Sequence, residues 1–282
     1  MRNFIVLFNE KEGTTPVMEL LDGFDTISVV HQVDGRWEPF DAHNCGPMRL
    51  GDLERCLRLL YAPGAIDIEA VNRLYLATGT KPLAPVEAGT AVGFKMRFHP
   101  PRRSRFGRLR RLQQKRFQAR MTSILHELDV TVFMAVRQDI LRWALSKYHG
   151  DGTGAPGHLQ FALAEGTISR ADIGRIHVDL PALGRILDVC RRVHARKRRI
   201  VDDLTQRGIR TAVLRYEDFV ADPSGFFAAA LAAIDVEPGP GEIEAVLARG
   251  TKFEKVHAVD LREFVENPDE VLAAYGEAFV PW

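Results

Sequence analysis

The stretch FIVLFNEKEGTTPVMELLD, residues 4–22, decides the fold of this 282-residue chain. It begins with a short apolar run, which predicts a buried strand, and continues through a polar turn that contains Gly13. Apolar residues then recur at helical spacing, so a helix is expected from Thr14 onward. A strand, a glycine turn and a helix N-terminus form a cradle for an anion, because the first N–H groups of a helix lack internal partners and its dipole favours negative charge.

Four residues of this turn are candidates for phosphate contacts. Gly13 allows close approach of the backbone, Thr14 and Thr15 add hydroxyl donors, and Lys11 adds a positive charge. The turn is not a nucleotide triphosphatase loop, which requires a lysine directly after its second glycine, whereas Lys11 precedes the only glycine here. An ordinary turn of an α/β fold is the alternative interpretation.

The composition is that of an ordinary soluble globular protein, with 46% hydrophobic and 27% charged residues. We expect a single domain over 1–282. The formal net charge of +1 argues against bulk binding to nucleic acid. No apolar run approaches the roughly 18 residues of a membrane helix, and the first run is too short for a signal peptide. Cys45, Cys56 and Cys190 lack metal-site spacing, so we expect reduced thiols in a cytoplasmic, bacterial protein.

Apolar runs alternate with helical patterns along the chain. Several runs are almost continuously apolar, which is typical of strands covered on both faces. We therefore expect an α/β fold with a central, mostly parallel sheet flanked by helices. The expected strands are 4–8, 26–31, 91–98, 130–136 and 211–216, and further helices are expected at 49–61, 104–128, 138–149 and 180–206. The Gly/Pro-rich stretches 150–157 and 237–242 are predicted to be loops.

A second candidate for anion contacts follows the strand 130–136. Arg137 ends this strand, and Arg142 and Ser146 lie in the helix expected after it. Ligands of open α/β sheets bind beyond the carboxyl ends of the strands, so Arg137 is expected near a phosphate held by the first turn. The planar guanidinium suits bidentate phosphate contacts. The alternative is that Arg137 pairs with a carboxylate and that Ser146 is an ordinary helix residue.

Several segments of the chain resemble the sulfotransferases that use 3′-phosphoadenosine 5′-phosphosulfate. The segments occur in the same order as in that family and are spread over nearly the whole chain. K-x-G-T-T after the first strand resembles their 5′-phosphosulfate loop, and RQDILRWALS (137–146) resembles their 3′-phosphate signature, with Gln138 where a second Arg often stands. GFKMRF (93–98), LRYEDFVADPS (214–224) and GTKFEKVHAVDLREFVENPDEV (250–271) resemble later segments. The nearest likeness is to the group containing trehalose 2-sulfotransferase; Golgi carbohydrate sulfotransferases are other relatives.

The resemblance implies a P-loop-containing sulfotransferase-type fold and transfer of a sulfuryl group to a hydroxyl of a carbohydrate, glycolipid or related small molecule. It implies that Lys11, Gly13, Thr14 and Thr15 hold the 5′-phosphosulfate and that Arg137 and Ser146 hold the 3′-phosphate. Arg142 would contribute if Arg137 is displaced, and Lys252 and Lys255 are candidates for the 3′-phosphate or adenine side. No metal is required if Lys11 and backbone donors stabilise the leaving phosphate.

A base must remove the proton of the acceptor hydroxyl. In the trehalose group, a glutamate before an aromatic residue, after the second strand, is the proposed base, and Glu38 matches that position. Partial burial suits a glutamate to this role. His31 is the rival, because the unperturbed pKa of histidine is closer to neutrality. We place Glu38 first on motif position; a structural role for either residue stays open.

Glu10 and Glu12 flank Lys11, where relatives usually carry small or basic residues. A carboxylate beside an incoming phosphosulfate would repel it. We therefore expect Glu12 to point away or to pair with a basic residue such as Arg97. Otherwise the loop would bind the donor weakly.

A basic segment without acidic residues runs from His99 to His126. It is interpreted as a solvated face, as a surface for an anionic saccharide or glycolipid acceptor, or as a nucleic-acid or membrane contact. The competing function class is therefore a non-catalytic phosphate- or nucleic-acid-binding α/β protein that uses the basic helix 102–120. A small-molecule kinase is less favoured, because the Gly-Lys-[Ser/Thr] loop is absent. The sequence leaves the oligomeric state open and allows a homodimer.

Overall fold

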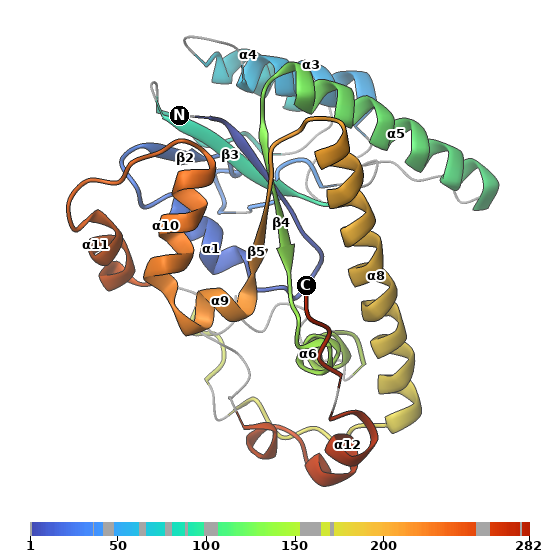
Figure 1. Ribbon diagram of the computed structural model, residues 1–282. Helices are drawn as coiled ribbons and strands as arrows, with labels where there is room; N and C mark the ends of the chain where they lie inside the picture. The colour runs from blue at the N-terminus through green and yellow to red at the C-terminus, as the bar shows by residue number, and fades with distance from the viewer. Residues whose placement is uncertain are drawn as a thin grey trace.

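The computed structural model describes residues 2–35, 37–41, 48–61, 66–76, 81–87, 90–98, 107–152, 165–169, 172–251, 260–276 and 278–282, with the backbone alone at 107–110 and 150–152. Within these ranges, five parallel strands form one sheet in the order β2-β3-β1-β4-β5 (Figure 1). They are β1 (Phe4–Leu7), β2 (Ile27–Val29), β3 (Ala91–Met96), β4 (Thr131–Val136) and β5 (Thr211–Arg215). All five predicted strands and the predicted α/β class are confirmed.

The central strand β1 pairs with β3 on one side and β4 on the other. Every residue of β1, β3 and β4 is buried, which explains why their sequences are almost entirely apolar, with Lys95 of β3 as the charged exception. Gly93 of β3 lies opposite Phe4, and a Cβ atom there would approach the Phe4 ring to 2.2 Å. The glycine therefore makes room for an aromatic side chain of the neighbouring strand.

The helices confirm the predicted amphipathic segments and add shorter ones. The predicted helices are α1 (Thr14–Leu21), α3 (Leu50–Leu60), α5 (Gly107–Glu127), α6 (Ile140–Gly152) and α8 (Leu180–Gln206). α10 (Pro223–Ala233) and α12 (Pro268–Tyr275) begin within two of the segments that carry the resemblance. The sequence analysis did not predict α4 (Ile68–Leu76), α9 (Tyr216–Ala221), α11 (Glu242–Arg249) or the short 3-10 helix at Leu261–Glu263.

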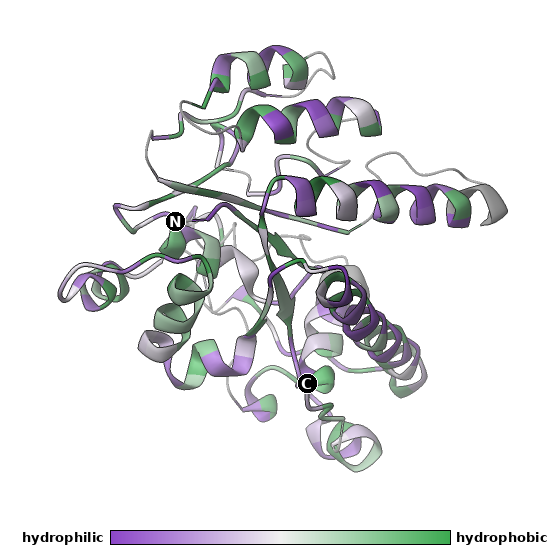
Figure 2. Cartoon of the chain, turned by 45° about the horizontal axis from the view of Figure 1, so that its top comes forward, coloured by the Kyte–Doolittle hydropathy of each residue, from purple (hydrophilic) through white to green (hydrophobic). Residues whose placement is uncertain are grey.

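Helices cover both faces of the sheet. Ile5 and Leu7 of β1 pack in a core with α3, α4 and α5, whereas Phe4 and Val6 pack on the opposite face with α1, α10 and α11. A third core joins α6, α8 and α12. Figure 2 shows the hydrophobic strands at the centre and the hydrophilic outer side of α8. Among the described helices, none is both long and apolar enough to cross a membrane.

Two helices begin with an Asp-Pro or Asn-Pro pair, but the first residue of the pair has a different role in each. Asp222 caps α10, because its carboxylate accepts a hydrogen bond from the N–H of Gly225 at 2.9 Å and Pro223 takes the first helical position. At α12, Asn267 takes the N-cap position and Pro268 the first helical position, but the Asn267 side chain makes no capping hydrogen bond. Its amide instead makes two hydrogen bonds with the backbone of Val178, of 3.0 and 3.1 Å. Asn267 thus ties the segment before α8 to α12.

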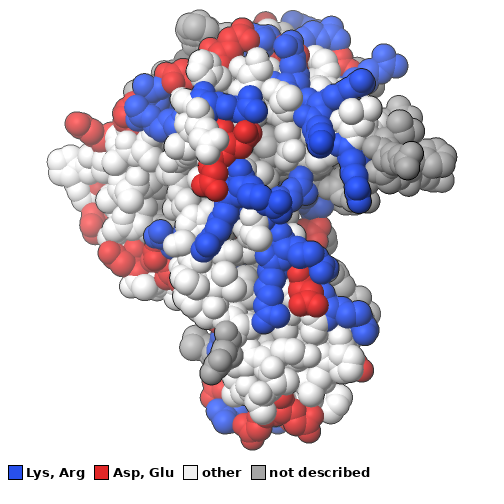
Figure 3. All heavy atoms as spheres, turned by 45° about the vertical axis from the view of Figure 1, so that its right-hand side comes forward, with Lys and Arg blue, Asp and Glu red and all other residues white. Residues whose placement is uncertain are grey.

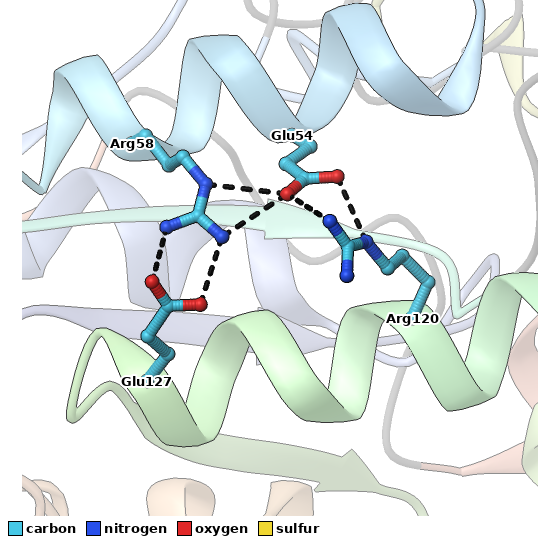
Figure 4. Close-up of polar contacts among 4 residues, drawn as sticks. All are labelled: Glu54, Arg58, Arg120 and Glu127. Atoms are coloured by element: carbon cyan, nitrogen blue, oxygen red, sulfur yellow. Dashed lines mark hydrogen bonds and ion pairs between the residues drawn. The ribbon is translucent and has the colours of Figure 1, made fainter.

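The basic helix α5 is partly balanced by acidic side chains (Figure 4). Glu54 of α3 lies between Arg58, at 3.0 Å, and Arg120 of α5, at 2.5 Å. Arg58 also pairs with Glu127 of α5 at 2.5 Å. The four side chains connect α3 to α5, so part of the positive charge of the basic segment belongs to helix packing.

Two of the three cysteines lie in the described part of the chain. Cys56 and Cys190 are buried and free, as predicted, and Cys45 lies outside the described residues. Burial raises the pKa of each of the two thiols to about 12. Both therefore stay protonated at neutral pH and belong to the cores.

Candidate functional site

The candidate residues gather at the carboxyl edge of the sheet. The β1–α1 loop, residues 8–13, follows the central strand, and the strand order places β3 and β4 on its two sides. Arg97 follows β3, Arg137 follows β4 and Tyr216 follows β5. In an open parallel sheet, ligands bind beyond the carboxyl ends of the strands. They bind at the point where the connections from two neighbouring strands run to opposite faces of the sheet.

The β1–α1 loop has a constrained backbone. Lys11 and Gly13 both have positive φ angles, of 65° and 76°. A Cβ atom at Gly13 would lie 2.4 Å from two ring carbons of Tyr216, so glycine is required by both conformation and space. Thr14 and Thr15 are buried at the start of α1. The loop thus brings Lys11 and the N-terminus of α1 together, as predicted.

Glu12 points away from solvent into a buried ion pair. The Nζ of Lys197, on α8, donates to both carboxylate oxygens of Glu12 at 2.5 and 2.6 Å and also to the Ala135 carbonyl. The N–H of Asn9 donates to the same carboxylate at 2.7 Å. Burial raises the pKa of Glu12 and lowers that of Lys197, and each charge opposes the shift of the other. The prediction that Glu12 pairs with a basic residue is confirmed, but this residue is Lys197 and not Arg97, the example given.

Arg97 pairs instead with the other flanking carboxylate, Glu10, at 2.5 Å, and with Asp41 at 3.1 Å. Lys147 of α6 approaches Glu10 to 3.4 Å. Partial burial alone would raise the pKa of Glu10, but these two cations outweigh it and the pKa is lowered. The carboxylates on both sides of Lys11 are therefore compensated by cations from β3, α6 and α8.

Arg137 lies against the loop. Its Nη1 donates to the carbonyl oxygen of Lys11 at 3.3 Å, and its guanidinium carbon is 4.7 Å from the centre of the Tyr216 ring. Burial lowers the pKa of Arg137. Its Nε is buried without a hydrogen-bond partner, and the guanidinium makes no ion pair, among the described residues. The alternative that Arg137 pairs with a carboxylate is not supported in this part of the chain.

Glu217 holds the turn between β4 and α6. Its Oε1 accepts hydrogen bonds from the N–H groups of Gln138 and Asp139, both at 3.0 Å. These donors immediately precede α6, so Glu217 fixes the path of the chain just after Arg137. The start of α9 thereby positions the turn between β4 and α6.

Helix α6 faces the loop with several side chains. The indole N–H of Trp143 donates to the Glu10 carbonyl at 2.8 Å, which fixes this side of the helix against the loop. Ser146 is half-buried and three residues further on, so it lies on the same side. Arg142 contacts Asp139, with its Nε 3.5 Å from a carboxylate oxygen. Arg142 is four residues before Ser146 and so lies on the same side of α6, and its positive charge acts on Arg137.

His149 is a further candidate site residue, which the sequence analysis did not identify. It is buried on α6, three residues beyond Ser146. Burial lowers its pKa, and the positive charge of Lys11 lowers it further, which places His149 close to the loop. The helical spacing Trp143, Ser146, His149 is the sequence signal that points to it. Lys252 and Lys255 lie outside the described residues.

Lys95 connects the loop to the candidate base. This lysine of β3 is fully buried, and its Nζ lies 2.7 Å from the Thr15 hydroxyl and 2.7 Å from an oxygen of Glu38. His31 has different neighbours: its Nδ1 lies 2.8 Å from the Gln32 carbonyl, and its ring is tilted against the Trp37 ring, with centroids 4.8 Å apart. The structure therefore links Glu38 to α1 through one ammonium group.

Comparisons with known proteins give low similarity. No protein-family model and no curated protein matches the chain. Among solved structures, sulfotransferase STF9 from Mycobacterium avium is 15% identical with a TM-score of 0.40, over 98% of this chain and 75% of that one. A sulfotransferase from Alicyclobacillus acidocaldarius is 17% identical with a TM-score of 0.42, over 99% and 92%. The sulfotransferase domain from the curacin biosynthetic pathway is 12% identical with a TM-score of 0.39, over 100% and 93%.

Proposed function

We propose that this protein is a sulfotransferase that moves a sulfuryl group from 3′-phosphoadenosine 5′-phosphosulfate to an acceptor hydroxyl. The observation that carries the proposal is the arrangement around the β1–α1 loop. Lys11 and the N-terminus of α1 lie beside Arg137, and Lys95 links Thr15 to Glu38. This arrangement combines an anion cradle, a second cation at the neighbouring strand end and a carboxylate within reach of the cradle.

The residues divide into two anion-binding groups. Lys11, Gly13, Thr14 and Thr15 would bind the 5′-phosphosulfate at the start of α1, where unpaired N–H groups and hydroxyls face the anion. Arg137 would bind the 3′-phosphate together with Ser146. The buried Nε of Arg137 supports this role, because a buried donor without a partner in the described residues gains from an anionic ligand. Lys252 and Lys255 stay candidates for the 3′-phosphate or adenine side.

The reaction would be an in-line displacement at sulfur. Glu38 would accept the proton of the acceptor hydroxyl, whose oxygen forms the new bond to sulfur. The bond between sulfur and the phosphate oxygen breaks, and adenosine 3′,5′-bisphosphate leaves. Lys11 and the first N–H groups of α1 would stabilise the charge that develops on the leaving phosphate. His31 is the less favoured base, because its described contacts are with Gln32 and Trp37.

The two glutamates of the loop do not oppose this function. Glu12 is buried against Lys197, and Glu10 pairs with Arg97 and Lys147. Three cations therefore balance Glu10, Glu12 and Asp41, the second partner of Arg97, so the loop glutamates are neutralised locally and do not repel an anionic donor at Lys11. A carbohydrate or glycolipid acceptor, as in the trehalose 2-sulfotransferase group, is the acceptor class that we propose.

The test is thermal stabilisation by adenosine 3′,5′-bisphosphate. A ligand that binds only the folded protein stabilises it by about 2.7 kcal/mol at a hundredfold excess over Kd. We expect a clear shift in the wild type that Arg137→Ala abolishes. Arg192→Ala, which removes an exposed arginine of α8, is the matched control and should keep the shift. Absence of a shift in the wild type at millimolar ligand would reject the function.

A second candidate function is favoured by the basic surface. Figure 3 shows Lys and Arg side chains gathered along α5 and α8. Arg185, Arg192, Arg196 and Arg199 follow one exposed stripe of α8, at spacings of seven, four and three residues. This surface suits a polyanion, so a non-catalytic nucleic-acid-binding protein is the competing proposal. Duplex binding that falls steeply with salt, without any response to the adenosine bisphosphate, would favour it.

A further inference from the structure

Lys95 is an unusual residue for its position. It lies in the apolar strand AVGFKM, with only 1% of its surface exposed. Burial of an ammonium is costly unless charges and hydrogen bonds compensate for it. Burial lowers the pKa of Lys95, and Glu38 opposes this shift. A buried lysine at the carboxyl end of a strand beside a candidate site therefore calls for an explanation.

Its three described contacts all lie at the candidate site. The Nζ of Lys95 is 2.7 Å from Thr15 Oγ1, 2.7 Å from Glu38 Oε1 and 5.0 Å from the centre of the Phe8 ring. Since both oxygens lie at the same distance from one nitrogen, they are at most twice that distance apart. Lys95 thus fixes the separation between the start of α1 and the candidate base.

The direction of the hydrogen bond to Thr15 has a chemical consequence. An ammonium group has three donors and no acceptor, so the Thr15 oxygen must accept in this contact. The hydroxyl hydrogen of Thr15 is then directed away from Lys95, and it is available to an oxygen of a bound anion. Glu38 anchors the ammonium from the other side and keeps it in place.

We propose that Lys95 is a positioning residue for the donor, which turns the Thr15 hydroxyl into a hydrogen-bond donor toward the 5′-phosphosulfate. This inference rests on the proposed sulfotransferase function and adds a residue to it. Lys95 acts through Thr15 and needs no contact of its own with the ligand.

The experiment is a double-mutant cycle on ligand affinity. Dissociation constants of adenosine 3′,5′-bisphosphate are measured for the wild type, Lys95→Met, Thr15→Val and the double variant. We expect each single variant to weaken binding about tenfold, as befits one hydrogen bond to a charged group. In the Thr15→Val background, Lys95→Met should cause no further loss, because the group through which it acts is absent. Additive losses, or unchanged affinity in Lys95→Met, would overturn the proposal.

Adenosine 3′-monophosphate is the matched control ligand, since it lacks the 5′-phosphate that Thr15 would contact. Its affinity should be the same for the wild type and Lys95→Met. An equal loss for both ligands would point to general damage to the site and overturn the positioning role. If the wild type binds neither ligand, the proposed function itself fails, which is distinguishable from failure of the Lys95 proposal alone.

Removal of Lys95 leaves Glu38 without this partner, so the stability of Lys95→Met is checked by urea unfolding. If that variant does not fold, Lys95→Met/Glu38→Gln removes both charges of the pair and is compared with Glu38→Gln. Relative to Glu38→Gln, the variant Lys95→Met/Glu38→Gln should again bind the bisphosphate about tenfold more weakly. This difference should vanish when both variants also carry Thr15→Val. The same affinity with and without Lys95 in the Glu38→Gln background would contradict the proposal.

Discussion

Lys197 and Glu12 form a buried ion pair that joins helix α8 to the loop after the central strand. The two residues are 185 positions apart, and both are almost fully buried. A pair of this kind is costly to break, because removal of one partner leaves an uncompensated charge in the interior. The pair therefore determines whether the loop keeps its conformation.

Lys197→Met should lower the free energy of unfolding by about 3–5 kcal/mol, since Glu12 loses its counter-charge. The double variant Lys197→Met/Glu12→Gln should regain much of this loss.

Burial raises the pKa of Glu12 and Lys197 opposes the rise, so the pKa is higher still in the single variant. A carboxyl whose pKa is raised on folding loses its stability contribution as the pH rises through that pKa. The decrease in the free energy of unfolding caused by Lys197→Met should therefore be larger at pH 8 than at pH 5. Urea unfolding measures both, and Arg199→Met, at an exposed position of α8, should change little.

Gly13→Ala should abolish binding of adenosine 3′,5′-bisphosphate and destabilise the protein. The new Cβ atom would need a positive φ and would meet the Tyr216 ring, which is held beneath Arg137. Calorimetric titration and a thermal scan measure the two effects. Gly51→Ala in α3 is the control: no atom lies within 4 Å of its added Cβ, so it should be neutral or slightly stabilising. Normal ligand affinity in Gly13→Ala would show that the loop tolerates another conformation.

Lys11→Ala should reduce turnover at least a hundredfold while the fold survives, because Lys11 is proposed to stabilise the leaving phosphate. Each factor of ten corresponds to about 1.4 kcal/mol of transition-state stabilisation. The measurement is release of adenosine 3′,5′-bisphosphate with an acceptor that the wild type turns over. Lys115→Ala, on an exposed position of α5, is the control and should keep its rate. Near-normal turnover in Lys11→Ala would remove this residue from the mechanism.

Acid should destabilise the protein through His194. Burial, with help from Arg198 and Lys197, lowers the pKa of this histidine to about 4. A group whose pKa is depressed on folding contributes stability above its unfolded pKa, about 6.5, and loses it as the pH falls toward the folded value. The wild type should therefore lose roughly 1–3 kcal/mol more than His194→Phe between these pH values. Unfolding curves at several pH values measure the difference, and the exposed His177 supplies the control variant His177→Gln. Parallel pH profiles for wild type and His194→Phe would contradict this assignment.

Glu54→Gln should lower the melting temperature at low salt and have a smaller effect in molar salt. Glu54 is the shared partner of Arg58 and Arg120, so its loss breaks the connection between α3 and α5 shown in Figure 4. Salt screens such pairs, which should reduce the difference from the wild type. Glu69→Gln in α4 is the control, because its contact with Arg73 is long, at 3.9 Å, and exposed. An effect of the same size at every salt concentration would assign the loss to packing instead.

Periodicity and local chemistry were sufficient to predict the sheet and the position of the loop. The strands are apolar because they are buried on both faces, and Gly13, Asp222 and Pro223 have short-range roles that a local sequence reveals. The partners of charged residues were harder to predict. Lys197 belongs to a helix with many exposed cations, and only its position among Cys190, His194 and Leu204 marks it as buried.

Lys95 and Glu12 show why the site could not be completed from the sequence. A charged residue in an apolar strand signals that a partner exists, but the partner is decided by which loops meet at the edge of the sheet. Arg97 was offered as an example of a basic partner for Glu12 and instead pairs with Glu10 and Asp41. The helices α4 and α11 were missed because each spans only two to three turns, which leaves few periodic positions to recognise.

The Tyr216 ring against Gly13 has a consequence for how the protein is made. Residues 8–13 leave the ribosome before Arg137, Lys197 and Tyr216, which contact this loop and are synthesised much later. Contacts between such distant parts of a chain form slowly, and a nascent chain completes them only after the later segments have emerged. The β1–α1 loop is therefore one of the last parts of the protein to reach its final conformation. A chain interrupted before Tyr216 should lack a working anion cradle, even with its central strand already complete.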